Sequence, residues 1–382
     1  MLHWRRAIGG ESGTMGRRSA IVAAAVAFVG VVAACTAAPA DGGGSPTTTA
    51  VTTSTTVPGE PFTIAFIGDS EPRMRGNTDA EVSAYVANLA SYRTSKVAYF
   101  DYAGGTHRIS PERVVLGGDI SADRDTSIAT GLPIWQQLYD DGIGFVAGFG
   151  NHDWDPEQWS DGPGYSVAGH ASNENTKAFT RETYRLTRQV LPGFDYREFG
   201  QTSTYGPVTF LSSYKGVDIA NFNTFLYQPS YYYPDGWPLT CNLLLGGAGC
   251  EIFVSAEGQI TNLSDQLSTD PARPTLFVEH YPLTTGSSWW SDYGASGTTV
   301  AQKQDRLLGL MARFDHTALL AGHNHVPGHY THAFGGRTLD EYVAPYFGGD
   351  GGEDLSQGGG FLALLVSPTA GVLEAKFVPG GI

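Results

Sequence analysis

Five short apolar runs are each followed at once by aspartate, asparagine or histidine, and this pattern constrains the fold more than any other feature of the chain. Apolar runs of this length beside glycine are typical of strands that are covered on both faces of an α/β sheet. Ligands bind at the carboxyl ends of the strands in such sheets. We therefore expect the polar residues to meet in one crevice. The runs are TIAFIGD, ending in Asp69; RVVLGGD, ending in Asp119; IGFVAGFGNHD, with Asn151 and His152; TLFVEH, ending in His280; and TALLAGHNH, with His323 and His325.

One such residue alone carries little weight, because turn formers and strand-end caps are commonly of these types. Five strand ends that all deliver metal-ligand types carry much more. Segments with helical periodicity alternate with the runs, which favours an α/β sandwich. The tract FLALLVSPTAGVLEAKFV predicts a closing hairpin. The predicted helices cover residues 79–93, about 134–139, 174–191, 255–267 and 300–314.

Residues 1–34 have the features of an export signal. Arg17 and Arg18 precede an apolar run, residues 20–34, which is short for a membrane span and typical of a signal-peptide core. The run closes with VAAC, and small residues before a cysteine resemble the lipobox of bacterial lipoproteins, in which Cys35 is lipidated and becomes the mature N-terminus. A plain cleaved signal with an incidental cysteine is the alternative.

The mature chain is predicted to begin with a tether, residues 35–60, and to continue as one domain, residues 61–382. The tether is mostly Thr, Ser, Ala, Pro and Gly, a composition that cannot bury a core. A lipid on Cys35 would hold the domain at the outer face of the cell membrane, and the lipid would be its membrane contact. In that oxidising compartment, Cys241 and Cys250 are expected to form a disulfide rather than a metal pair or two free thiols.

The charge of the chain disfavours nucleic acid as a partner. The formal net charge is −15, and the leader is basic, so the domain itself is strongly acidic. No Lys/Arg-rich stripe is present to supply the electrostatic footprint that nucleic-acid binding needs. An acidic protein still binds phosphates when metal ions invert the local field.

The motifs at the strand ends resemble those of the calcineurin-like metallophosphoesterase superfamily, which includes the purple acid phosphatases and related phosphodiesterases. The resemblance extends from about residue 62 to 377, and GNHD followed by GHNH is its most specific part. It implies a four-layer α-β-β-α metallophosphoesterase sandwich with mixed sheets. The motifs are GD at Gly68 and Asp69, GGD at 117–119, GNHD at 150–153, EHYP at 279–282 and GHNH at 322–325.

The resemblance also implies a centre with two transition-metal ions, Mn, Fe or Zn. Asp119 would bridge the ions, because a shared anion offsets the repulsion between two close cations. Asn151, His280 and His323 would complete one shell, while Asp69 and His325 belong to the other. The ions would hold a water whose lowered pKa yields a hydroxide for in-line attack on phosphorus. His152 falls where the family places the group that stabilises the transition state and protonates the leaving oxygen.

The first shell departs from the family pattern. Many members have Asp-x-His where this chain has Asp69-Ser70-Glu71, and Ala122 stands where purple acid phosphatases have a tyrosine. Our hypothesis is that Glu71 replaces the histidine, which gives an oxygen-rich shell that favours Mn²⁺ or Fe over Zn²⁺. The alternative is a surface acid paired with Arg73. Arg124 is interpreted as a solvated charge rather than a phosphate ligand.

Other aromatic and histidine residues are left with open or structural interpretations. The tract FLYQPSYYYPDGW is interpreted as packing of an insertion, with an aromatic lid as the alternative. Trp289 and Trp290 line the site or pack beside it. His329 and His332 are expected at the surface, and His107 and His170 receive no role.

These observations predict a monomeric, extracytoplasmic, dinuclear metal-dependent enzyme that hydrolyses a phosphomonoester or phosphodiester. The alternative is an inactive cell-surface binding protein that keeps the metallophosphoesterase fold. Its support is the missing histidine of Asp-x-His, and the intact GHNH stands against it.

Overall fold

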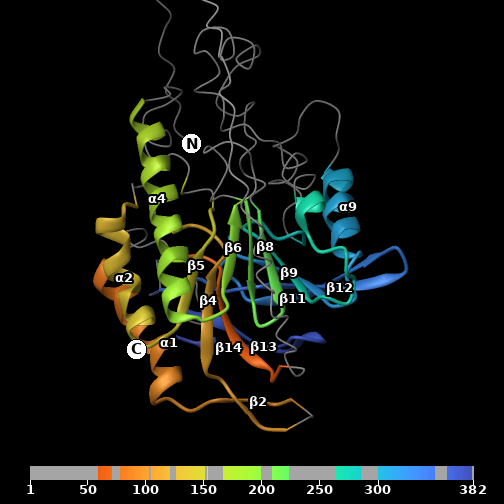
Figure 1. The fold of residues 1–382 in the computed structure, drawn as a ribbon, viewed down its shortest axis with the longest axis horizontal. Helices are drawn as coiled ribbons and strands as arrows, with labels where there is room; N and C mark the ends of the chain where they lie inside the picture. Colours follow the sequence, from red (N-terminus) through yellow and green to blue (C-terminus); the bar gives the residue numbers. More distant parts are fainter. Residues whose placement is uncertain are drawn as a thin grey trace, which may run out of the picture. The chain divides into compact units, whose positions relative to one another are not determined.

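Two mixed β-sheets form the centre of the fold (Figure 1). The computed structural model describes residues 59–70, 78–102, 105–120, 126–150, 153, 167–198, 209–222, 263–284, 300–348 and 359–380. All of them belong to one unit of the chain, Thr55–Ile382. No helix in these ranges is both long and apolar enough to cross a bilayer.

The first sheet has the strand order β14-β13-β1-β4-β5. Its strands β1, β4 and β5 are parallel, while β13 pairs antiparallel with both β1 and β14. The predicted closing hairpin, β13–β14, is thereby confirmed. The bounds are β1 Phe62–Ile67, β4 Pro111–Leu116, β5 Gly144–Ala147, β13 Gly360–Ser367 and β14 Gly371–Pro379.

The second sheet has the order β11-β12-β10-β9-β8-β7-β6. Four neighbours, β12, β10, β9 and β8, are parallel, and the strands outside them are antiparallel. A separate two-stranded ribbon joins β2 Tyr99–Phe100 and β3 His107–Arg108. The bounds are β6 Asp195–Glu198, β7 Phe210–Tyr214, β8 Val217–Asn221, β9 Thr275–Glu279, β10 Thr317–Ala321, β11 Gly328–Phe334 and β12 Arg337–Val343.

Three apolar clusters separate four layers. One lies between the sheets and joins Phe66 and Val115 of the first to Leu276 and Leu320 of the second. A second packs α1 (Asp79–Thr94) and α2 (Ile128–Asp140) on the outer face of the first sheet. The third places α9 (Val300–Met311) against the outer face of the second sheet. The predicted α/β, four-layer α-β-β-α sandwich with mixed sheets is confirmed.

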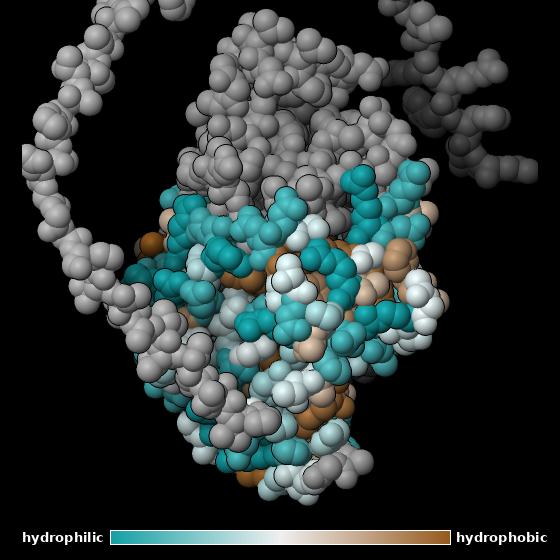
Figure 2. Space-filling view, turned by 45° about the vertical axis from the view of Figure 1, so that its right-hand side comes forward, coloured by the Kyte–Doolittle hydropathy of each residue, from teal (hydrophilic) through white to brown (hydrophobic). Residues whose placement is uncertain are grey.

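Local sequence explains where the helices begin. Thr78 caps α1 and Glu81 reaches back to it, and Ser127 and Thr130 make the same reciprocal arrangement at α2. Both helices then bury one apolar side, with Val86 and Leu89 in α1 and Trp135 in α2. The polar sides of the elements are left facing solvent. In agreement, the described surface in the view of Figure 2 is mostly hydrophilic.

The predicted helix bounds need corrections. Helix α1 follows the prediction, but α2 begins at Ile128 and α4 spans Val167–Val190, so both start earlier than their apolar periodicity does. The first turns of α4, VAGHASN, consist mostly of small or polar residues, which hides them from a hydrophobic pattern. Helix α9 ends at Met311, three residues early. Of the predicted helix at 255–267, only residues 263–267 are described, and 263–266 are helical.

The five apolar runs are all strands, β1, β4, β5, β9 and β10. They are divided between the two sheets, three in the first and two in the second. The sheets nevertheless meet where these strands end. Asp69, just after β1, forms a parallel bridge with Tyr346, just after β12. A Cβ on Gly68 would lie 2.9 Å from Gly322 Cα. The expected crevice is therefore shared between two sheets.

Candidate metal centre

Side chains from four strand ends meet at this junction. The ligand atoms of Asp119, His280 and His323 all lie within 4.8 Å of one another. His280 Nε2 is 3.1 Å from Asp119 Oδ2 and 3.7 Å from Asp69 Oδ1. His325 Nε2 is 3.6 Å from the same Asp69 oxygen. Five of the predicted ligands, from β1, β4, β9 and β10, are thus brought together.

Four of these five groups are almost completely removed from solvent, and His323 is partly buried. Asp69 and His280 are 0% exposed, Asp119 is 1% exposed and His325 is 7% exposed. Asp69 Oδ2 accepts a hydrogen bond from the backbone N–H of His323 at 2.7 Å, but the buried Oδ1 accepts none. An unsatisfied buried polar atom costs about 1–3 kcal/mol and calls for an explanation, such as an ion. Asp69 Oδ1 is therefore available as a metal ligand.

The backbone at the same residues is held in an unfavourable region. Asp119, His323 and His325 have φ values of 49°, 65° and 61°. Of the described non-glycine residues with positive φ, the remaining one is Lys215, in the tight turn between β7 and β8. Positive φ in side-chain-bearing residues costs about 1–3 kcal/mol and clusters at functional sites. Three such residues converge here without forming a hairpin turn.

Glycine makes the close approach of these loops possible. A Cβ on Gly150 would lie 2.0 Å from Asp119 Oδ1 and 2.4 Å from Asp119 N. A Cβ on Gly322 would lie 2.7 Å from Gly68 O and 2.8 Å from Asp69 Oδ2. Real Cβ atoms do not come so close, so a larger residue at either position would push the two carboxylates aside.

The electrostatics of the two inner histidines are opposed. Burial alone would lower the pKa of His280, but the carboxylates of Asp119, Asp69 and Glu279 outweigh it and raise that pKa to about 9. Burial and the neighbouring charge of His280 lower the pKa of His323 to about 3. Without an ion, one imidazole carries the proton that balances the carboxylates while the other stays neutral. A metal cation would take the place of that proton.

Several supporting residues went unrecognised in the sequence. Asp153, the last residue of GNHD, is 2% exposed, and its Oδ2 accepts from Gly150 N at 2.7 Å and Ile120 N at 3.2 Å. It joins the loops after β4 and β5. The Tyr346 ring lies 4.9 Å from that of His325. Only the position of Asp153 inside a motif could have pointed to it; Tyr346 had no such signal.

Asn221, at the carboxyl end of β8, is another unrecognised residue. It is 1% exposed, and its Nδ2 donates no hydrogen bond. It packs against the end of β5, because a Cβ on Gly148 would lie 2.3 Å from Nδ2. A buried amide is thus left against the end of β5.

Some predicted residues lie outside the described part of the chain, and their roles stay predictions. Among the described ones, His329 is exposed and pairs with Asp340 Oδ1 at 2.8 Å. His332, also expected at the surface, is partly buried: its side chain is 19% exposed and bonds to fully buried Glu341. The two histidines lie on opposite faces of β11. The residues outside are Glu71, Asn151, His152, Cys35, Cys241, Cys250, Arg73, Ala122, Arg124, Trp289, Trp290 and the FLYQPSYYYPDGW tract.

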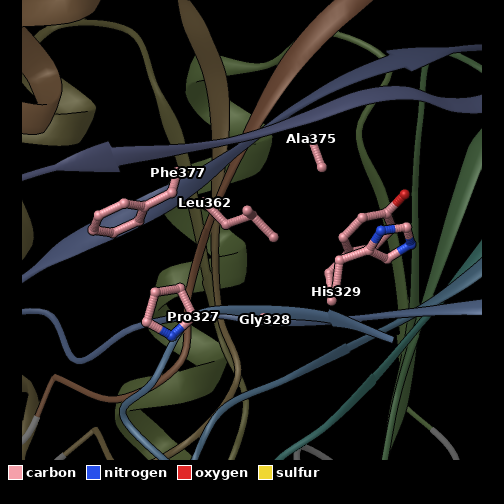
Figure 3. Close-up of a pocket in the computed structure, with 7 residues that line it drawn as sticks. Pro327, Gly328, His329, Leu362, Ala375 and Phe377 are labelled. Carbon is pink, nitrogen blue, oxygen red and sulfur yellow. The ribbon is translucent and has the colours of Figure 1, made fainter. Parts of the chain in front are cut away.

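A pocket lies where β11 and β12 face β13 and β14 (Figure 3). The rings of His329 and Tyr342 stack on one side at a centroid distance of 4.5 Å. The opposite side is apolar, with Leu362, Ala375 and Phe377. None of the predicted metal ligands within the described residues lines this pocket, so the buried cluster remains the candidate site.

Comparisons with known proteins do not identify a function for this site, so its assignment rests on the geometry of the chain. No protein-family model matches it, and neither does any curated protein. Among solved structures, it is similar to phosphopantetheinyl hydrolase from Mycobacterium tuberculosis, with 15% identity, 75% of this chain and 91% of that one covered, and a TM-score of 0.35. It is also similar to sulfate thiohydrolase SoxB from Thermus thermophilus in complex with glycerol, with 11% identity and a TM-score of 0.33. That match covers 85% of this chain and 58% of the other.

Both TM-scores are low, so no activity is inferred from these likenesses. The residues themselves meet the requirements of a transition-metal site. Two carboxylates and three imidazoles converge, one carboxylate oxygen has no hydrogen-bond donor, and the side chains are buried or partly buried. Imidazole and carboxylate ligands together suit Mn, Fe and Zn.

Proposed function

We propose that this chain is a metal-dependent hydrolase that cleaves a phosphate ester with two metal ions bound at the junction of its sheets. The observation that carries the proposal is the convergence of Asp119, His280 and His323 beside Asp69, whose inner oxygen makes no hydrogen bond. The order of the GNHD and GHNH motifs, which the resemblance to metallophosphoesterases rests on, supports the same conclusion.

The geometry supports a division into two shells that share Asp119. Asp69 and His325 face each other on one side, while His280 and His323 lie beside Asp119 on the other. When bound, the two ions would supply a water of lowered pKa and offset phosphate charge. Asn151 is proposed as a further ligand of the second shell. His152 is proposed as the proton donor to the leaving oxygen.

The residues that hold the cluster also prepare it for a charged ester. Burial keeps bulk water from competing for the carboxylates, which strengthens every electrostatic interaction there. His323 is neutral at ordinary pH because its pKa is lowered to about 3, so it offers a lone pair to an ion without first losing a proton. Asp153 ties Ile120, next to Asp119, to Gly150 through one carboxylate oxygen.

Metal identity follows from the ligand types. If Glu71 joins Asp69 and Asp119, the first shell is rich in oxygen and favours Mn²⁺ or Fe over Zn²⁺. Replacing Glu71 with alanine is expected to weaken the first ion while the second stays bound. Two ions bound with unchanged affinity in Glu71→Ala would end the ligand hypothesis.

We also propose that the protein acts outside the cytoplasmic membrane, tethered through a lipid on Cys35. The support is the apolar leader that ends in VAAC and the tether that follows it. Metabolic labelling with a fatty acid tests this proposal. Label is expected in the full-length chain and not in Cys35→Ala, and equal labelling of both would contradict the anchor.

The proposed activity is tested with p-nitrophenyl phosphate and its bis ester. Chelated protein is dialysed against Mn²⁺, Fe²⁺ or Zn²⁺, and hydrolysis is compared between wild type, Asp119→Asn and the surface control Asp340→Asn. Hydrolysis that needs metal, is lost in Asp119→Asn and persists in Asp340→Asn is expected. Metal binding without hydrolysis of either ester would favour an inactive binding protein. Failure to bind any of the metals would contradict the proposal outright.

A further inference from the structure

The turn that follows β9 carries His280, and its backbone is held by one neighbouring carboxylate and by two groups far away in the sequence. His280 O accepts from Gly322 N at 3.0 Å. Tyr281 N donates to Glu279 Oε1 at 3.3 Å, and Leu283 N donates to Glu341 Oε1 at 2.6 Å. Pro282, between them, has no N–H to place. Two backbone donors of this turn, Tyr281 N and Leu283 N, are therefore met by carboxylates that are both 0% exposed.

Glu341 is the more distant and the more heavily engaged of the two. It lies on β12, and its Oε2 accepts from Thr284 Oγ1 in addition to the bond from Leu283 N to Oε1. His332 Nε2, on the neighbouring strand β11, lies 2.8 Å from the same Oε2. Buried carboxylates are stable only when their oxygens are well satisfied, and these contacts fix Glu341 from two directions.

The clamped turn has a direct link to the metal cluster. Tyr281, next to His280, is 1% exposed. Its ring lies edge-on to the His323 ring at 4.4 Å and to the His280 ring at 5.3 Å. A shift of the turn would therefore move His280 through the backbone and His323 through the Tyr281 ring.

We propose that Glu341 is a positioning residue of the metal centre. By tying residues 283 and 284 to β12, it fixes the turn that aims His280 and holds the Tyr281 ring against His323. His332, on the neighbouring strand β11, holds Glu341 in place through its contact with Oε2. The inference rests on the proposed metal-dependent function for its metal readout, while the ordering of the turn can be measured without metal.

The chain supplies a matched control on the same two strands. Asp340, adjacent to Glu341, pairs with His329 at the same 2.8 Å separation. This pair is exposed, with side-chain accessibilities of 52% for His329 and 42% for Asp340, and it does not reach the turn. Removing a carboxylate charge from β12 is thus possible with and without loss of the clamp.

The experiment compares Glu341→Gln with Asp340→Asn in the full mature chain. Hydrogen exchange of the segment 279–284 is measured on metal-free protein, and Mn²⁺ affinity is measured by titration calorimetry. In Glu341→Gln we expect faster exchange and a Kd for Mn²⁺ raised by roughly 10–100-fold, the usual cost of losing a group that orients a ligand. In Asp340→Asn, both quantities are expected to stay at wild-type values.

Steady-state hydrolysis of p-nitrophenyl phosphate adds a kinetic arm. With Mn²⁺ saturating, we expect Glu341→Gln to lower kcat by a larger factor than it changes KM. The reason is that the turn orients a metal ligand and does not touch substrate. If Glu341→Gln does not fold, Thr284→Val replaces it, since that variant removes a single donor to Oε2. Its expected effect has the same direction and is smaller.

Unchanged exchange and unchanged Mn²⁺ affinity in a folded Glu341→Gln, or in Thr284→Val when that variant stands in for it, would overturn the inference. An equal loss in Asp340→Asn would do so as well, because the effect would then come from charge alone. A wild-type protein that binds no Mn²⁺ would instead contradict the proposed function. The exchange measurement would still decide whether Glu341 orders the turn.

Discussion

Two buried acid–histidine clusters lie close together in this protein, and they differ in almost every physical respect. At the metal cluster, Asp69 Oδ1 accepts no hydrogen bond and three residues have positive φ. At Glu341, both carboxylate oxygens have donors, and no described residue of β11 or β12 other than glycine has positive φ. Burial of ionisable groups is common to both.

This difference distinguishes a cluster that needs a ligand, the metal cluster, from one that only supports the structure, the Glu341 network. A fully bonded network such as that of Glu341 is stable by itself and needs no ligand. The metal cluster combines a carboxylate oxygen that accepts no hydrogen bond, backbone strain and crowded carboxylates, and each of these costs free energy. A bound cation would offset all three, which is why the strained cluster, and not the satisfied one, is assigned the chemistry.

The largest expected effect comes from removing the shared carboxylate charge. Asp119→Asn keeps the size of the side chain but removes the anion that balances both ions. Metal affinity and hydrolysis are expected to fall by more than the roughly 10–100-fold caused by loss of a residue that only orients a ligand. Metal content and p-nitrophenyl phosphate hydrolysis measure this. A loss no greater than that of Glu341→Gln would erase the distinction between the clusters.

A methyl group at Gly150 is expected to break the cluster sterically. Its Cβ would meet Asp119 backbone and side-chain atoms at 2.4 and 2.0 Å, so Asp119 must move. Gly309 in α9 is the control, because a Cβ there meets only the Phe334 ring at 3.4 Å or more. Gly150→Ala is expected to lose metal affinity, while Gly309→Ala is expected to gain about 0.5–1 kcal/mol in unfolding free energy.

Denaturant titration and metal binding on the two alanine variants make this comparison. Normal metal affinity in Gly150→Ala would mean that the close approach of Gly150 to Asp119 is not needed to hold the metal.

The pH dependence of stability gives a smaller and more specific signal. The folded-state pKa of His280 is about 9, above its ordinary value, so its contribution in metal-free protein is complete below about pH 6.5 and lost as pH rises toward 9. The lowered pKa of His323, about 3, makes the unfolded state bind more protons between about pH 3 and 6.5, so stability rises with pH there.

Unfolding free energy of the chelated protein is therefore expected to have a maximum near pH 6.5 from these two groups. Metal should remove the decline above that pH, because the ion replaces the proton on His280. Urea titrations across pH 4–9, with and without Mn²⁺, measure the curves, which carry at most about one proton of slope on each side. The same decline with and without metal would contradict a role for His280 as ligand.

The smallest expected effect is at the exposed pair. His329→Ala removes a contact with Asp340 that is open to solvent, and such pairs contribute about 0–1 kcal/mol. Mn²⁺ affinity and hydrolysis should match wild type. A substantial loss of hydrolysis would instead connect the pocket beside His329 to the reaction.

Much of this architecture could be predicted from the sequence because it is local. Apolar runs ending in Asp69, Asp119 or His280 identify buried strands and place their polar ends, and the periodicity of residues 79–93 identifies α1. The split of the five strands into two sheets was not readable in this way, since it depends on pairings between distant segments.

The supporting residues were hidden for the same reason. Asp340 and Glu341 are adjacent acids on an alternating strand, and the sequence does not say which of their two faces will be covered. The turn after β9 and His332 cover the face of Glu341, and neither contact is local. Asp153 was visible within GNHD, but its bonds to Gly150 and Ile120 depend on the approach of two loops.

The most direct test of the account is the metal content of the mature protein after Mn²⁺ loading and desalting. Two ions per wild-type chain, fewer in Asp119→Asn and two in Asp340→Asn are the predicted results. A wild-type chain that retains no ion, or an Asp119→Asn variant that retains both with wild-type affinity, would contradict the assignment of this cluster as a shared metal site.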